Sequence, residues 1–124
     1  MDQSERFHQQ LRDLAPKIYD ARVNVLKSEV NLKKVFWQQL VIAKDAGERS
    51  YNAQKARAEA SEEYEEASME VAVAKATLDS HNTMKAAADM EFEEWRTKMA
   101  NLRMERSRYG CLLYTSDAAD DTPC

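Results

Sequence analysis

The sequence predicts an all-α fold built around two long helices. Only two Gly and two Pro occur in 124 residues, and charged residues make up 32% of the chain beside 44% hydrophobic residues. Such a composition is typical of long helices and coiled coils. In residues 61–109, apolar side chains recur alternately every three and four positions with no Gly or Pro before Gly110. This heptad pattern indicates one continuous helix with an apolar seam along its length.

The helix expected at residues 61–109 is too long to cover its own seam. At 1.5 Å per residue it would measure about 70 Å, so it needs a partner along its length. Ser61 is a suitable N-cap, and the acidic residues behind it favour the positive end of the helix dipole. Eleven of the fourteen seam positions are apolar or aromatic, the seam being Tyr64, Ala67, Val71, Ala74, Leu78, His81, Lys85, Ala88, Phe92, Trp95, Met99, Leu102, Arg106 and Tyr109.

The other helix is expected at residues 4–46. Ser4 is a candidate N-cap, and Pro16 predicts a kink or a restart, which would leave a short extra helix in front of it. Gly47 is placed to end the helix at the C′ position. Residues 53–60 form either a short helix of their own or the first part of the long one.

Residues 4–46 carry two apolar seams on nearly opposite faces. The first consists of Leu11, Leu14, Ile18, Ala21, Val25, Ser28, Leu32, Val35, Gln39, Ile42 and Ala46, and the second of Val23, Leu26, Val30, Lys33, Trp37 and Leu40. A helix that is apolar on two sides usually packs between two neighbours.

Two helices of matched length joined by a polar connection predict an antiparallel, coiled-coil-like hairpin. The first seam would face the long helix. The second seam would remain for self-association through Val23, Leu26, Val30, Trp37 and Leu40, so we expect a homo-oligomer. The alternative is a set of exposed apolar residues with no partner, which is common on protein surfaces.

No motif for catalysis, a cofactor or a metal ion is present, so we expect a protein that is not an enzyme. The chain lacks a Gly-rich phosphate loop, HExxH and GxSxG. The glutamate pairs of residues 61–109 lack the Glu-x-x-His pattern of di-iron helical proteins. No apolar stretch approaches the length of about 20 residues that spans a bilayer, and the start, MDQSERFHQQ, lacks the basic-then-apolar pattern of a signal peptide. We therefore expect no membrane contact and a cytoplasmic location.

Basic residues gather near the end of the second helix. Residues 96–108 hold five bases and one acid, and residues 12–34 hold six bases and three acids. In an antiparallel hairpin we expect these two regions to lie side by side and bind single-stranded nucleic acid. The expected contacts are Arg96, Lys98, Arg103, Arg106 and Arg108, joined by Lys17, Arg22 and Lys27. The alternative is that bases at a helix C-terminus only suit the helix dipole.

The last fourteen residues differ from all that precede them. They contain both Cys residues and one Pro, and no basic residue. Residues 111–121, beginning CLLYTSDAAD, resemble the translation of a transposase sequencing adapter. That resemblance implies a truncated metagenomic read, with one domain at residues 1–110 and a non-native, disordered tail at 111–124. The alternative is an authentic disordered tail. Residues 1–110 hold 18 Lys and Arg against 19 Asp and Glu, a net charge of −1 instead of −4.

The stretches ASEEYEEA, EVAVAKATL and MEFEEWRTKMANLRMERSRYG resemble small all-helical bacteriophage proteins of replication and recombination. In layout the chain is also similar to UvsY-type recombination mediators. That resemblance implies a non-enzymatic accessory protein of DNA recombination that self-associates. Its implied partners are single-stranded DNA and a recombinase or single-strand-binding protein. The alternative function is a structural or scaffolding coiled coil, such as a virion assembly factor or chaperone, that binds protein helices.

Overall fold

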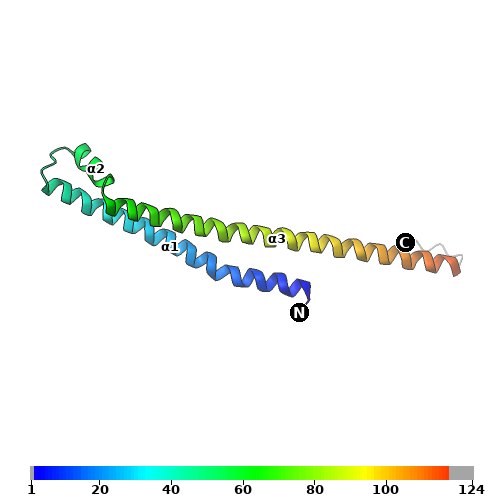
Figure 1. Cartoon of the computed structure of the whole chain (residues 1–124). Coiled ribbons are helices and arrows are strands. Elements are labelled where there is room, and N and C mark those ends of the chain that lie inside the picture. The colour runs from blue at the N-terminus through cyan, green and yellow to red at the C-terminus, as the bar shows by residue number, and fades with distance from the viewer. Residues whose placement is uncertain (1, 118–124) are drawn as a thin grey trace.

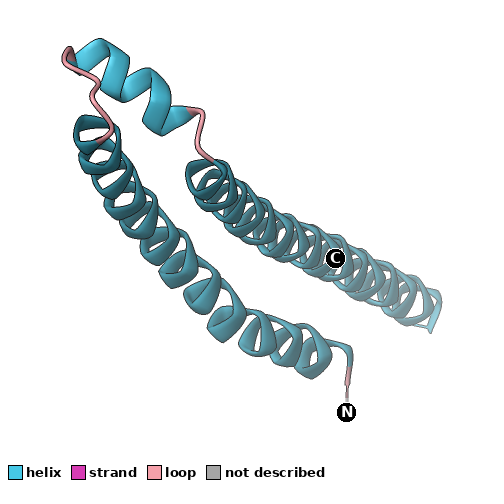
Figure 2. Ribbon diagram, turned by 60° about the vertical axis from the view of Figure 1, so that its left-hand side comes forward, coloured by secondary structure: helices cyan, strands magenta, loops and turns pink. Residues whose placement is uncertain are grey.

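The computed structural model describes the backbone of residues 2–117 and the side chains of residues 2–108. Within residues 2–117 the chain is all-α, with three helices and no strand: α1 (Gln3–Asp45), α2 (Tyr51–Glu59) and α3 (Glu62–Asp117). The two long helices lie side by side and run in opposite directions, and α2 lies across the bend that joins them (Figures 1 and 2). The fold is therefore a long, thin pair of helices.

The contacts between α1 and α3 fix which residues face each other. The ring of Phe7 lies 5.4 Å from that of Phe92, and the ring of Phe36 lies 6.0 Å from that of Tyr64. Because 7 pairs with 92 and 36 with 64, the numbers of facing residues add to about 100. The first residue of α1 therefore faces a position near 97. Beyond about residue 100, α3 projects past the start of α1, as Figure 1 shows.

The core is a narrow line of residues along the contact between the long helices. On α1 its most buried members are Phe7, Leu14, Ile18 and Ala21, and on α3 they are Ala67, Val71 and Ala88. Leu40 and Ala43 near the end of α1 are also buried, at the level of α2, whose Ala58 is 1% exposed. Small residues on α3 near the bend let the helices approach closely. At the other end Phe7 fills the space between them and packs against Phe92 and Trp95, with ring centroids 5.4 and 6.2 Å away.

The predicted first seam of α1 is wrong at its C-terminal end. Ile42 is 53% exposed and Ala46 is exposed, whereas Leu40 and Ala43 are 6% and 1% exposed. A straight helix has 3.6 residues per turn, so a strict seven-residue repeat drifts by about 20° per heptad. Over the four heptads from Leu14 to Ile42 the drift reaches about 80°, which carries Ile42 out of the contact. The same drift moves Leu40 from the outer face into the core.

The N-terminus of α1 differs from the prediction, whereas its C-terminus agrees with it. Asp2, not Ser4, is the N-cap, and its carboxylate accepts a hydrogen bond from the Glu5 backbone N–H at 2.8 Å. A carboxylate in this position also favours the positive end of the helix dipole. The helix runs through Pro16 without a restart.

Gly47 ends α1 at C′, as its position predicts, with a φ of +103° that few residues with a Cβ adopt. The backbone N–H groups of Gly47 and Glu48 donate to the carbonyls of Lys44 and Ala43, at 3.1 and 3.2 Å. These two bonds form a Schellman motif, which satisfies carbonyls that the helix end leaves free. The chain therefore turns away sharply from α1.

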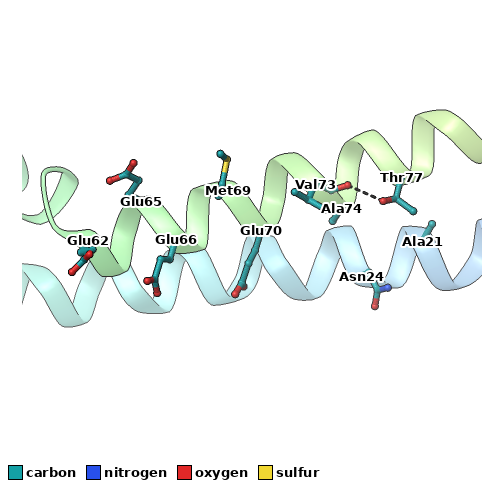
Figure 3. A pocket seen from close by; sticks show the side chains of 10 residues that line it. All are labelled: Ala21, Asn24, Glu62, Glu65, Glu66, Met69, Glu70, Val73, Ala74 and Thr77. Carbon is teal, nitrogen blue, oxygen red and sulfur yellow. Dashed lines mark hydrogen bonds between the residues drawn. The ribbon is translucent and has the colours of Figure 1, made fainter.

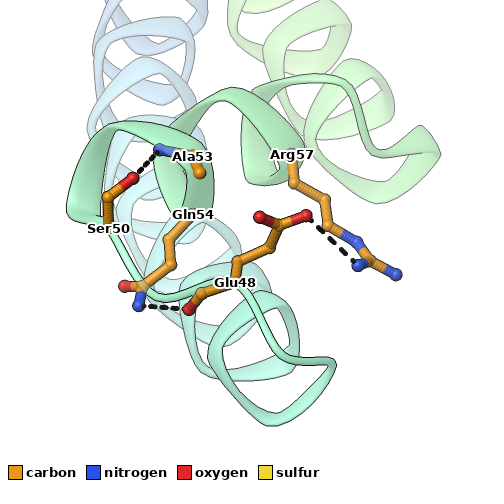
Figure 4. Close-up of polar contacts among 5 residues, drawn as sticks. All are labelled: Glu48, Ser50, Ala53, Gln54 and Arg57. Atoms are coloured by element: carbon orange, nitrogen blue, oxygen red, sulfur yellow. Dashed lines mark hydrogen bonds and ion pairs between the residues drawn. The ribbon is translucent and has the colours of Figure 1, made fainter.

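Polar contacts surround α2 at the bend (Figure 4). Ser50 caps α2, its hydroxyl accepting from the Ala53 N–H at 3.1 Å. The Gln54 side chain donates to the Glu48 carbonyl at 2.9 Å, and the Glu48 carboxylate lies 3.8 Å from the Arg57 guanidinium. Residues 51–59 thus form a helix of their own.

Ser61 begins α3 as its sequence context predicts. The Ser61 hydroxyl accepts a hydrogen bond from the Tyr64 N–H at 3.2 Å. The far end of α3 differs from the expected end at residue 109, because the helix continues to Asp117. Residues 111–117, expected in a disordered tail, are therefore helical. Residues 118–124 of that expected tail lie outside the described part of the chain.

Candidate interaction surfaces

The face of α1 directed away from α3 carries a line of exposed apolar side chains, which we call the outer stripe. Its members are Tyr19 (68% exposed), Leu26 (62%), Val30 (67%), Trp37 (61%) and Val41 (58%), with Val23 half-buried among them. They are spaced by three, four or seven residues, so they share one side of the helix. At 100° per residue, this side is turned by about 130° from the side that contacts α3.

Most of the residues predicted for self-association lie on this stripe, and one does not. Val23, Leu26, Val30 and Trp37 are on it, whereas Leu40 is 6% exposed and belongs to the core. Sequence reasoning did not include Tyr19 and Val41. Tyr19 could have been found by continuing the spacing of four residues backward from Val23.

The projecting end of α3 has a different character. Arg103, Arg106 and Arg108 are exposed there, Glu105 being the one acid in residues 99–108. None of the three arginines forms an ion pair within the described residues. Leu102 and Met104 are also exposed, at 42% and 55%. This end presents cations and apolar side chains together, with no helix facing it in the described part of the chain.

Arg96 differs from the arginines beyond it because its side chain makes contacts within α3. Its guanidinium lies 3.1 Å from the Glu93 carboxylate and 5.8 Å from the centre of the Phe92 ring. Next to it, Trp95, Met99 and Arg103 line a depression of about 280 Å³ where α1 begins. The depression marks the point at which the core opens to solvent.

The eight cations predicted to bind nucleic acid do not form one patch. Since the numbers of facing residues add to about 100, Lys17, Arg22 and Lys27 lie beside the middle of α3. At 1.5 Å per residue, Lys17 and Lys27 are about 30 and 45 Å along the axis from Arg103. The expected side-by-side arrangement is wrong, because α3 extends past α1 and carries its arginines away. Arg103, Arg106 and Arg108 remain together on the projecting end, and Lys98 lies at the level where α1 begins.

An open groove of about 750 Å³ lies along α3 near the bend (Figure 3). Its acidic side chains, Glu62, Glu65, Glu66 and Glu70, all come from α3, while Ala21 and Asn24 of α1 form part of its other wall. Among residues 2–108, no group of three or more His, Cys, Asp or Glu side chains is arranged to hold a metal ion. The glutamates therefore make an acidic surface at the bend end of the molecule.

His81 interrupts the contact between α1 and α3. Its Nδ1 atom is buried and has no hydrogen-bond partner in the described structure. A buried polar atom without a partner costs about 1–3 kcal/mol. Lys85, at the next seam position, is exposed. His81 therefore leaves one unsatisfied polar atom in the contact between α1 and α3.

None of the helices in the described residues is long and apolar enough to cross a membrane. Comparison of the chain with protein-family models, curated proteins and solved structures finds no match.

Proposed function

We propose that this chain is a non-enzymatic assembly protein, a coiled-coil-like helical hairpin that binds further helices through the outer stripe of α1. The observation that carries this proposal is the exposure of Tyr19, Leu26, Val30, Trp37 and Val41, each 58% or more, on one side of a single helix. Together they form an exposed apolar patch of roughly a few hundred Å², the size that marks interaction sites on soluble proteins. The partner is a helix because the stripe has heptad spacing.

Polar substitutions in the stripe test this function. The double variant Leu26→Glu/Val30→Glu is expected to sediment as a monomer at concentrations where the natural sequence sediments as a larger species, because two carboxylates would be buried without partners. Both positions are exposed in the single chain, so the circular dichroism spectrum should stay helical. Sedimentation velocity over a hundredfold concentration range makes the measurement.

Met84→Glu/Met90→Glu is the matched control. Met84 and Met90 are 51% and 66% exposed on α3, away from the stripe. This variant has the same added charge and should assemble like the natural sequence. A natural chain that is monomeric throughout the range, or a control that dissociates equally, would contradict assembly through the stripe.

A second candidate function is favoured by the projecting end of α3. Arg103, Arg106 and Arg108 stand exposed on it, and phosphates of single-stranded nucleic acid bind such cations without regard to sequence. Together with oligomerisation, such contacts would suit a DNA recombination accessory protein that works with a recombinase or a single-strand-binding protein. Assembly through α1 and nucleic-acid binding through α3 use separate surfaces, so both functions are compatible.

A further inference from the structure

We propose that the partner of the outer stripe is the same stripe of a second copy, lying antiparallel, with Val23 of each copy facing Leu26 of the other. This inference rests on the proposed assembly function and adds the partner, its direction and its register. The symmetry axis then passes between the levels of Asn24 and Val25. Three observations lead to it. The residues along the stripe form complementary layers, the charged residues beside it form opposite pairs, and other registers would bring like charges together.

The stripe supplies complementary layers in this register. Extended by its own spacing, it reads Arg12, Pro16, Tyr19, Val23, Leu26, Val30, Lys33 and Trp37, all exposed except the half-buried Val23. The central layers are apolar, Val23 with Leu26 and Tyr19 with Val30 of the second copy. A further layer sets Trp37 against Arg12, where a guanidinium and an indole ring attract. Val41 lies beyond it, at the level of His8 of the second copy. Lys33 lies against Pro16, its alkyl stem on the ring and its ammonium in water.

Charged residues on both sides of the stripe also match. In coiled coils the residues that flank the apolar seam decide the partner and the orientation. On one side, Asp20 lies beside Lys27 of the second copy, and Asp13 beside Lys34. On the other side, Arg22 lies beside Glu29, a residue whose carboxylate also sits 3.6 Å from the Lys75 ammonium.

By symmetry each of these three pairs occurs twice in the dimer. All six pairs consist of opposite charges, which attract. Five of the six residues are exposed and Glu29 is half-buried, so all are accessible to a second copy.

Other arrangements bring like charges together. A shift by one heptad in one direction sets Lys27 against Lys27 and Glu29 against Glu29. The opposite shift sets Asp20 against Asp20 and Arg22 against Arg22. A parallel pair would stack Lys33 on Lys33 within the seam. Like charges held together in an interface cost free energy and select against the arrangement that contains them.

The dimer has a consequence for the basic ends. Each α3 projects past the start of its own α1, and the two α1 helices run antiparallel, so the two projecting ends point in opposite directions. At 1.5 Å per residue, Arg103 lies about 40 Å along the axis from the symmetry centre. The two arginine clusters are then about 80 Å apart, so one short oligonucleotide cannot reach both.

Chemical cross-linking between copies tests the register. In a Cys111→Ser/Cys124→Ser background, an Asp13→Cys chain is mixed with a tagged Lys34→Cys chain and treated with a short bis-maleimide. The mixture should form cross-linked heterodimers, because these positions flank the seam at the same level. Each variant alone should not, since two copies of position 13 would be about 35 Å apart along the axis at 1.5 Å per residue.

Asp20→Cys mixed with Lys34→Cys is the matched control, because these positions meet only after a shift by one heptad. Cross-linking of the control mixture, or of Asp13→Cys alone, would overturn the proposed register. The same samples are examined by sedimentation velocity. Association without a cross-link between positions 13 and 34 would overturn this inference and leave the proposed assembly standing. Absence of association in every sample would overturn both.

Discussion

Replacing Leu14 with alanine is expected to lower the free energy of unfolding by about 2–3 kcal/mol, the range for a buried leucine whose cavity partly collapses. Leu14 is 5% exposed near the middle of the contact between α1 and α3. Its neighbours Ile18 and Ala21 are also buried, so Leu14 belongs to a continuous apolar contact. For a domain of this size the loss corresponds to a midpoint of thermal unfolding about 10 °C lower.

The matched control is the same change at Leu26, which is 62% exposed on the same helix. In dilute samples that contain only monomers, Leu26→Ala should change the free energy of unfolding by less than about 0.5 kcal/mol. Urea unfolding followed by circular dichroism compares the two variants. Equal losses for Leu14 and Leu26 would mean that α1 does not contact α3 through the face described above.

Reversing the charge of Arg103, Arg106 and Arg108 together is the second large effect expected. If the projecting end of α3 holds single-stranded nucleic acid, Arg103→Glu/Arg106→Glu/Arg108→Glu should weaken binding of a fluorescent oligonucleotide by at least tenfold at low salt. Each lost phosphate contact reduces the slope of log affinity against log salt by about 0.7, so three contacts reduce it by about 2. Fluorescence anisotropy over a salt series measures both quantities.

A control variant changes the net charge equally at the opposite end. Arg49→Glu/Lys55→Glu/Arg57→Glu reverses three cations at the bend, where the pairs of Lys55 and Arg57 with acids are exposed and contribute little to stability. This variant should bind nearly as well as the natural sequence. Equal weakening by both variants would mean that only net charge matters, and no binding at low salt would refute the nucleic-acid role.

Local signals in the sequence predicted the places where the helices begin and end. Gly47 was placed at C′ because a left-handed residue suits glycine, and Ser61 was placed as an N-cap because its hydroxyl reaches a free N–H. Both assignments depend on neighbours within four residues. The prediction of Ser4 as the N-cap was wrong for an equally local reason. Asp2, two positions earlier, offers a charged acceptor to the Glu5 N–H.

The relative position of the long helices could not be read from the sequence. Any two apolar seams of this length pair in several registers that differ by one heptad, and matched helix lengths suggested flush ends. The register depends instead on where large side chains fit, such as Phe7 between Phe92 and Trp95. In this register α3 projects past the start of α1, and the cations of α1 lie far from Arg103 and its neighbours.

Helix geometry explains why Leu40 and Ile42 lie on other faces of α1 than predicted. A pattern read by threes and fours has a period of 3.5, whereas α1 follows 3.6 residues per turn. The discrepancy is negligible over the two turns around Leu26 and Val30. It accumulates by Leu40, which was predicted on the outer face and lies in the core.

The most direct test of assembly through the outer stripe is the fluorescence of Trp37. In a Trp95→Phe variant Trp37 is the one tryptophan, and it is 61% exposed in the single chain. Its emission should move to shorter wavelength as the protein is concentrated and return on dilution, because the second copy covers the indole. The same variant carrying Leu26→Glu/Val30→Glu should emit at long wavelength throughout. Emission typical of an exposed indole at every concentration would contradict assembly through the outer stripe.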